Sequence, residues 1–361
     1  MDVSLPYNIR LLFGGEMFYE SMTGSTAIFS SPLPENLPVI CPVDSNGVPL
    51  GTCPRQFVHD INRIVGAVYL NAQWRPVQKL SLDAGVRLQG AFGGRGYGLV
   101  PLASASIVWN FIGDFHLKAN YASGFRAPVF QATDAVFGGV SFGPNPKLRN
   151  ETSQSFQGEV NGRILRNTKQ VRELELRVDY SYTLLKDLIQ INNGSYGNTG
   201  RRAIHAVEAF ARLYLQGDHT FSASYTFLAG QSTDTGHLRG FPNHWFSIGG
   251  TFSIVKRVLD INTNLNVFGA YEDPNRYPSG PGPFPEAATQ ARSTDLVWDR
   301  LTPVALLQVG TRVRFFKEKL ALSAQFYNVL NQKYFLPDFF YDLTPTQAPG
   351  FSFFASITYK P

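Results

Sequence analysis

Charged residues and long apolar runs are both scarce in this sequence. Asp, Glu, Lys and Arg make up 16% of the 361 residues, whereas about 25% is usual for a soluble domain. No apolar stretch reaches the roughly 18 residues that a membrane-spanning helix requires. Residues 1–6 contain neither a basic segment nor an apolar one, so they are not a secretory signal. These absences argue against a typical soluble enzyme and against a helical membrane protein.

Basic clusters are also missing, and cysteines are few. The net charge of +5 is spread along the chain, so no nucleic-acid partner is expected. The two cysteines, Cys41 and Cys53, share a stretch rich in proline and glycine. We predict that they form a disulfide across an exposed loop in an oxidising compartment, which would stabilise the chain by about 3 kcal/mol; an unlinked reduced pair is the alternative. Two cysteines alone make a poor zinc site, because structural zinc needs four ligands. We predict no metal site and no cofactor.

Aromatic residues are abundant, at 14% of the chain, with 29 Phe and 16 Tyr. The mean hydropathy is nevertheless close to neutral, at −0.11. Many aromatics and few charges at neutral hydropathy are typical of strands that are apolar on one face and polar on the other.

Apolar and polar residues alternate with a period of two along most of the chain. In the segment 80–89, Leu82 and Val86 fall on one face and Asp83 on the other, and the segment 259–268 repeats the pattern. Side chains alternate across a strand, so each such segment has one apolar and one polar surface.

The connections between these segments are alternately short and long, for example 75–79 followed by 90–99. Transmembrane barrels show this asymmetry, with tight periplasmic turns and long extracellular loops. We therefore predict an all-β, transmembrane antiparallel meander β-barrel of about 14 strands. The expected strands are 7–19, 61–75, 80–89, 100–110, 114–125, 151–164, 171–190, 201–214, 219–228, 243–254, 258–271, 305–315, 320–334 and 350–360.

The apolar face of such a sheet must contact the outer-membrane lipid, because hydrocarbon cannot solvate charges. The polar face then borders water. It is expected to carry Arg63, Asn71, Asp83, Arg87, His116, Lys118, Glu159, Arg163, Glu175, Arg177, Asp179, Arg312 and Arg314.

Three short stretches go beyond the alternation. They read NYASGFRAP at 120–128, NPKLRNETS at 145–153 and FYNVLNQKY at 326–334. The first two resemble the "GFRAP … NPxLxPE(T/S)" region of TonB-dependent outer-membrane receptors, and the third resembles the "NVFNKxY" segment of their penultimate strand. We refer to 120–128 and 145–153 as the two motif boxes. Asn150 departs from the pattern, since the family usually has proline there.

The resemblance implies a barrel of 22 strands around a plug, in the outer membrane of a Gram-negative bacterium. This chain would correspond to the last part of that barrel. Residues 1–361 would form one partial barrel domain without a plug, and the signal peptide would lie upstream. The implied function is TonB-dependent uptake of a scarce solute such as a siderophore or another small nutrient, without enzymatic activity. Contact with the TonB complex would require the plug segment that this chain lacks.

The resemblance and the loop positions together suggest where a ligand would bind. Arg126 ends a strand on the long-loop side, and exposed aromatic clusters in long loops often mark binding sites. The candidate ligand contacts are Arg126, Tyr277, Trp298, Phe339, Phe340 and Tyr341. The alternative for each is a purely structural role.

Other site patterns are weaker. No histidine lies between Arg126 and Asn145, where haem receptors of the family carry one. His237 and His244 share a predicted loop but lack suitably spaced carboxylates for a metal. The glycines of 93–98 suggest a phosphate loop, but no helix follows them, so we interpret them as giving loop flexibility.

Two other functions remain open at this stage. One is a self-contained, passive, porin-like channel; the other is a soluble β-rich binding protein. The sequence upstream of residue 1 separates a receptor from a porin, and detergent dependence of the folded chain separates both from a soluble protein.

Overall fold

The computed structural model describes residues 1–27, 55–136, 143–192, 194–233, 236–272, 300–336 and 346–360. Cys41 and Cys53, with the predicted disulfide, lie outside these residues. No helix within the described ranges is long and apolar enough to cross a membrane.

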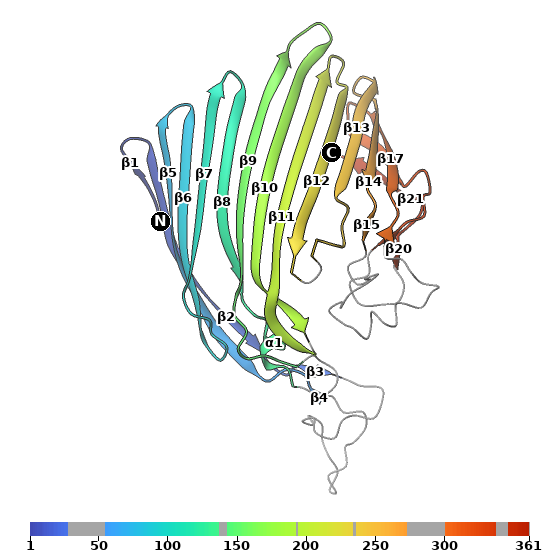
Figure 1. Ribbon diagram of the computed structural model, residues 1–361. Coiled ribbons are helices and arrows are strands. Elements are labelled where there is room, and N and C mark those ends of the chain that lie inside the picture. The colour runs from blue at the N-terminus through green and yellow to red at the C-terminus, as the bar shows by residue number, and fades with distance from the viewer. Residues whose placement is uncertain are drawn as a thin grey trace. The chain divides into compact units, whose positions relative to one another are not determined.

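Fifteen antiparallel strands follow one another in chain order within one sheet, so the predicted meander is confirmed (Figure 1). Fourteen of them match predicted strands, and a short first strand is added. The strands are β1 (Asp2–Leu5), β2 (Ile9–Met22), β5 (Ile61–Val77), β6 (Leu80–Gly93), β7 (Val100–Ile112), β8 (Phe115–Arg126), β9 (Glu151–Arg166), β10 (Val171–Asn192), β11 (Ser195–Leu215), β12 (Thr220–Ser232), β13 (His244–Val255), β14 (Leu259–Phe268), β17 (Val304–Phe315), β18 (Leu320–Tyr327) and β21 (Ser352–Tyr359).

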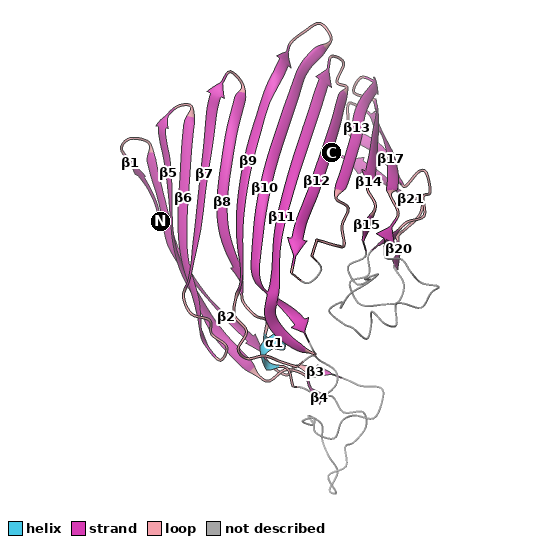
Figure 2. Cartoon of the chain, in the orientation of Figure 1, coloured by secondary structure: helices cyan, strands magenta, loops and turns pink. Residues whose placement is uncertain are grey.

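Short elements complete the described fold. Three two-stranded ribbons pair β3 (Thr26–Ala27) with β4 (Arg55–Gln56), β15 (Tyr271–Glu272) with β16 (Arg300–Leu301), and β19 (Phe335–Leu336) with β20 (Thr346–Gln347). One five-residue helix, α1 (Phe130–Asp134), is the cyan element of Figure 2 and lies beside β3 and β4.

Contacts divide the chain into two units. The first unit holds residues 1–107, 120–156 and 183–202, and the second holds 108–119, 157–182 and 203–361. In the first unit, the tight turns after β1 and β5 lie at the upper end of the strands in Figure 1 and α1 lies at the lower end. The strand ends near α1 are called the long-loop end below.

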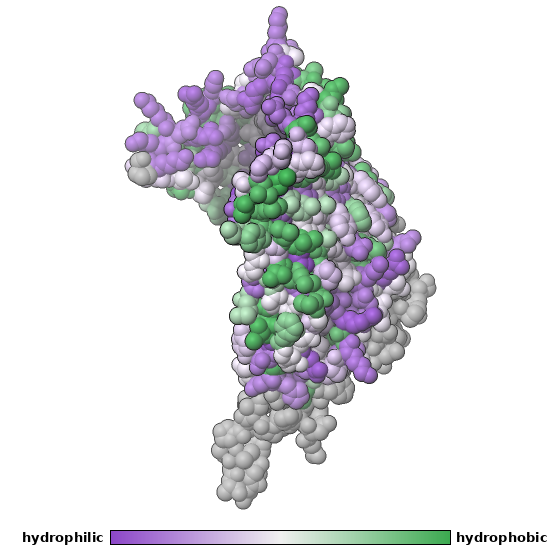
Figure 3. Space-filling view, turned by 90° about the vertical axis from the view of Figure 1, so that its left-hand side faces the viewer, coloured by the Kyte–Doolittle hydropathy of each residue, from purple (hydrophilic) through white to green (hydrophobic). Residues whose placement is uncertain are grey.

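The sheet exposes its apolar side chains, whereas a soluble protein would bury them. On β5 and β6, Val68 is 60% exposed and Val86 is 58% exposed. The polar residues between them contact one another instead: the Asn71 amide donates to Asp83 Oδ1 across 2.8 Å, and Arg87 bonds Glu16. Figure 3 shows hydrophobic residues gathered over the strands on the side that carries β1. The apolar face is therefore the one that contacts lipid.

Adjacent residues of β14 provide a matched test of this orientation. Leu265 lies opposite Ile248 and Leu307 on the apolar face, and Asn266 lies on the polar face. We expect Leu265→Arg to destabilise the protein by about 2–4 kcal/mol, because a lipid-facing cation is poorly solvated. Asn266→Arg is expected to change the stability by about 0.5 kcal/mol at most. Urea unfolding of the refolded chain in lipid vesicles measures both, and equal losses would contradict the orientation.

Two strand ends differ from the sequence-based boundaries. The expected loop 191–200 is wrong, because β10 and β11 continue through it with Gly194 at φ 73° in the turn. Conversely, β18 stops at Tyr327 rather than at residue 334. Asn328 and Asn331 follow it with φ of 48° and 47°, a left-handed conformation that asparagine tolerates better than most residues.

The asparagines after β18 bond the local backbone, as their side-chain chemistry predicts. Asn328 Oδ1 accepts from the Gln332 amide at 2.9 Å, and the Asn328 side chain donates to the Gln332 carbonyl at 3.0 Å. Asn331 Oδ1 accepts from the Phe351 amide at 3.0 Å. The Asn331 bond ties this turn to the residue that precedes the last strand.

Candidate functional site

The two motif boxes line one small cavity at the long-loop end of the first unit. Its volume is about 300 Å³. We call this cavity the motif pocket. It is lined by Arg63, Arg95, Gly96, Tyr97, Gly98, Pro128, Thr133, Pro146, Leu148, Arg149 and Asn150. Three arginines and no carboxylate belong to this lining.

Arg63 is the most buried of the three arginines, with its side chain 10% exposed. It rises from β5 on the polar face and forms an ion pair with Glu20 of β2 at 2.5 Å. Its guanidinium carbon also lies 4.7 Å from the Phe130 ring centre and 5.4 Å from that of Tyr97. Cation–π contacts of this kind stabilise a desolvated guanidinium, so Arg63 joins β5 to α1.

Arg95 fixes the other side of α1. Its Nε donates to both carboxylate oxygens of Asp134, at 2.8 and 3.0 Å, and Asp134 is buried.

The glycines beside Arg95 have a packing role that the flexibility interpretation missed. The Gly94 amide donates to the Asn62 carbonyl at 2.9 Å, and a Cβ at Gly96 would collide with the Ala91 carbonyl.

Arg126, the predicted ligand contact, lies at the end of β8 and pairs with Glu151 at the start of β9. The Arg126 side chain is 72% exposed, whereas that of Glu151 is 6% exposed. Glu151 Oε1 also accepts from the Ile189 amide of β10 at 2.7 Å. Arg126 therefore neutralises a buried carboxylate that joins three strands, while most of its own side chain remains exposed; it does not belong to the lining of the motif pocket.

The second motif box is held by the β10–β11 extension. The Asn198 side chain bonds the backbone of Arg149 twice, at 2.7 Å to the amide and 2.9 Å to the carbonyl. Arg149 itself is 72% exposed at its side chain and bonds Asp187 at 2.7 Å. The longer strands that the sequence did not predict thus support the motif pocket.

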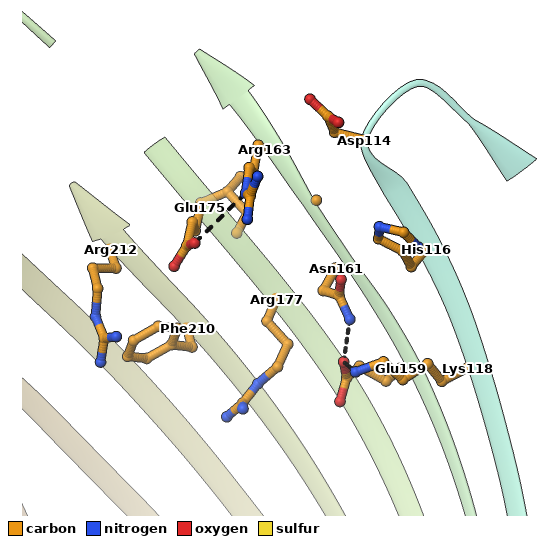
Figure 4. A pocket seen from close by; sticks show the side chains of 12 residues that line it. Asp114, His116, Lys118, Glu159, Asn161, Arg163, Glu175, Arg177, Phe210 and Arg212 are labelled. Atoms are coloured by element: carbon orange, nitrogen blue, oxygen red, sulfur yellow. Dashed lines mark hydrogen bonds and ion pairs between the residues drawn. The ribbon is translucent and has the colours of Figure 1, made fainter. Parts of the chain in front are cut away.

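A larger cavity lies in the second unit, on the polar face of β8 to β11 near the turn at Asp114 (Figure 4). Its volume is about 690 Å³. We call the residues that line this cavity the charged wall. They are Asp114, His116, Lys118, Glu159, Asn161, Gly162, Arg163, Glu175, Leu176, Arg177, Phe210 and Arg212.

Opposite charges on the charged wall are paired across neighbouring strands. Lys118 donates to Glu159 at 2.7 Å, and Arg163 lies 3.8 Å from Glu175. In Figure 4 the Phe210 ring lies between two guanidinium groups, and the carbons of Arg177 and Arg212 are 5.4 and 5.0 Å from its centre. The charged wall carries four cationic and three anionic side chains, and this mixture suits a water-lined surface or a polar protein segment.

The His, Cys, Asp and Glu side chains of the described residues form no group of three or more that could hold a metal ion. His237 instead bonds Glu272 at 2.5 Å, and His244 lies on β13, where Nδ1 is 2.8 Å from the Tyr225 hydroxyl. The two histidines do not share a loop, because β13 begins at His244.

The other predicted ligand contacts cannot be placed on this site. Tyr277, Trp298, Phe339, Phe340 and Tyr341 all lie outside the described residues. The functional residues that sequence reasoning missed are Arg95, Tyr97 and Asp134. Of these three, only Arg95 could have been noticed in the sequence, as a charged residue within a glycine-rich stretch. Its partner Asp134 could not have been recognised, because it is distant in sequence.

The chain is similar to a known family over most of its length. The model of the family "TonB dependent receptor-like, beta-barrel" matches residues 2–329. The chain therefore belongs to this family of transporters and receptors, whose members are located in the outer membrane of Gram-negative bacteria.

Solved structures agree with this fold at low sequence identity. The siderophore receptor PirA from Acinetobacter baumannii matches 99% of this chain with a TM-score of 0.74 and 14% identity. The ferric enterobactin receptor PfeA of Pseudomonas aeruginosa, in a mutant form, matches 99% with 0.69 and 14%. The copper transporter OprC matches 97% with 0.68 and 12%. The chain spans 53%, 52% and 54% of these three chains, respectively.

Proposed function

We propose that this chain supplies barrel strands to a receptor for TonB-dependent uptake of a scarce solute, such as a siderophore or a metal complex. The observation that carries the proposal is the convergence of both motif boxes on the motif pocket. Exposed guanidinium groups of Arg126 and Arg149 at that end are suited to bind anionic ligand groups, because arginine forms forked hydrogen bonds with carboxylates and similar anions.

The charged wall fits a second part of the same function. In receptors of this class a plug occupies the barrel interior, and its polar surface needs hydrogen-bonding partners. The alternating cations and anions of the wall offer such partners. We propose that the plug and the remaining strands come from polypeptide outside residues 1–361, which accords with a match to about half of each solved receptor.

Growth on a scarce ligand tests the receptor function. A strain deleted for the complete gene is expected to lose growth on one ferric siderophore or metal complex of a panel, and inactivation of TonB should cause the same loss. Unchanged growth on every ligand, together with ion conductance of the purified protein in planar bilayers, would instead indicate the passive porin.

An arginine substitution tests the ligand site. We expect Arg149→Ala to weaken binding of the growth-supporting ligand about tenfold, the equivalent of about 1.4 kcal/mol, because one charge-assisted bond is lost. Arg166 is the matched control, since it is exposed, pairs with Asp114 at 3.0 Å and belongs to the second unit. Equal effects of Arg149→Ala and Arg166→Ala on the affinity, measured by ligand titration of cells, would contradict the assignment.

A further inference from the structure

A second part of the polar face in the second unit carries amide and hydroxyl groups in place of charges. β12, β13, β14, β17 and β18 follow one another in the sheet (Figure 1), and their pairing registers show which residues share the polar face. The residues that β12 places there opposite β13 are all serine or threonine. β14, β17 and β18 add the amides of Asn262, Asn264, Asn266, Gln308 and Gln325. We call the polar face of these five strands the neutral wall.

Charged side chains occur on the described part of the neutral wall only beside the short turns. Asp260 is the second residue of β14, and Arg312 and Arg314 lie among the last four residues of β17. Asp260 and Arg314 bond each other at 2.5 Å. The remaining length of these strands is uncharged on the polar face, whereas the charged wall of β8 to β11 holds seven charged groups in one cavity.

The amide side chains lie flat along the neighbouring strands. A Cβ at Gly310 of β17 would collide with the Asn262 side chain, and one at Gly249 of β13 would lie 2.9 Å from Asn264 Oδ1. Asn262 and Asn264 therefore occupy the space that larger residues at the two glycines would fill. The Ser247 hydroxyl donates to Asn264 Oδ1 at 3.0 Å and holds this arrangement. The neutral wall is thus low in relief, and it offers hydrogen bonds close to the backbone.

Two aromatic rings lie at the end of the neutral wall that is opposite the short turns. Trp245, the second residue of β13, and Phe268, the last residue of β14, are partners in the register. Their ring centres are 5.0 Å apart, and Trp245 is 45% exposed. Aromatic rings give an organic solute a large apolar contact. The neutral wall therefore presents an aromatic entry, followed by amides at successive levels of β14.

The two walls differ in how strongly they would hold a plug. Hydrogen bonds to an ionised group are roughly twice as strong as those between neutral groups. Plug surface bound to Lys118 or Glu159 is therefore harder to detach than plug surface bound to Asn264 or Gln308. A solute in transit also needs sites that it can leave again, since passage requires binding that is weak and repeated. Neutral amides at successive levels supply such sites.

We propose that the solute passes along the neutral wall when the receptor opens, while the plug stays bound to the charged wall. The plug separates first where its hydrogen bonds are neutral, and the solute replaces it there. This inference rests on the proposed function, because it requires a plug and TonB-driven uptake. The order of opening is measured without any uptake ligand, so the two proposals fail separately.

Thiol labelling of the purified full-length protein in rising urea tests the order of opening. Asn264→Cys places a thiol on the neutral wall, five residues after the start of β14. Asn161→Cys is the matched control, five residues before the end of β9 on the charged wall. With methanethiosulfonate ethylsulfonate as the probe, both thiols should be protected without urea. Below the unfolding transition of the barrel, Asn264→Cys should be labelled about tenfold faster than Asn161→Cys.

The wild-type protein reports any background from Cys41 and Cys53. Equal labelling of the two introduced thiols in urea would overturn the inference, as would protection of both up to the barrel transition. Immediate labelling of both without urea would show an open lumen, which contradicts the plug and therefore both proposals. Should Asn264→Cys fail to fold, Gln308→Cys replaces it, because Gln308 is its register partner on β17.

The same thiols in living cells connect the opening with uptake. In the presence of the complex that supports growth in the panel above, functional TonB should raise the labelling rate of Asn264→Cys about tenfold. The labelling rate of Asn161→Cys should not change. Uptake that proceeds while only Asn161→Cys is labelled would overturn the passage along the neutral wall and leave the receptor function standing.

Discussion

Replacing Arg126 by alanine should destabilise the long-loop end of the first unit by about 3 kcal/mol. The reason lies in its partner: Glu151 is almost fully buried, and removing one member of an ion pair leaves an uncompensated buried charge. The double variant Arg126→Ala/Glu151→Gln is expected to lose less, because the neutral amide oxygen still accepts from Ile189. Urea unfolding in lipid vesicles gives the free energies for this comparison.

Arg149→Ala is the control for that measurement. Its partner Asp187 is 35% exposed, and exposed ion pairs contribute about 0–1 kcal/mol. A loss of stability in Arg149→Ala as large as in Arg126→Ala would show that burial of Glu151 does not decide the effect. So would a double variant that is less stable than Arg126→Ala.

Arg63→Met is expected to release α1 from the strands beside it. The substitution removes the ion pair with Glu20 and the cation–π contacts with Phe130 and Tyr97. It also removes two longer hydrogen bonds, of 3.4 Å each, to the carbonyls of Arg95 and Pro128. Together these interactions are expected to contribute about 3 kcal/mol locally, so amide exchange around α1 should become about a hundredfold faster.

Hydrogen exchange reports this release through named amides. Ala132 donates to the Val129 carbonyl at 3.0 Å, and Val136 donates to the Phe57 carbonyl at 2.9 Å. Both amides should lose protection in Arg63→Met, while those of β18 in the second unit should not change. Arg63→Lys retains the charge but not the planar fork, and an intermediate rate is expected. Unchanged protection of Ala132 in Arg63→Met would refute the role of Arg63.

These two arginines differ in how well the sequence predicted them. Arg126 belongs to a motif box, so the family resemblance singled it out. Arg63 was placed on the polar face by alternation alone. Its contacts with Glu20, Tyr97 and Phe130 join residues far apart in sequence, and no local pattern reports such a meeting.

Strand boundaries show a similar division. The start of β6 at Leu80 followed from its alternation, and the structure agrees. The end of β18 at Tyr327 was not predicted, because apolar residues such as Val329 and Leu330 follow it closely, whereas Asn328 turns into the left-handed conformation. The extension of β10 and β11 was missed because their polar residues resemble a loop, although pairing between the two strands satisfies the backbone there.

The sequence by itself determined that this protein is a meander of membrane strands with one apolar and one polar face. That information is local, since a period of two fixes each residue's face, and the motif boxes added the family. Only the tertiary structure decided which side chains meet, as in the motif pocket and the charged wall. The physical reason is that strand register and loop packing bring together residues from separate strands, whose contacts depend on distances in space rather than on spacing along the chain.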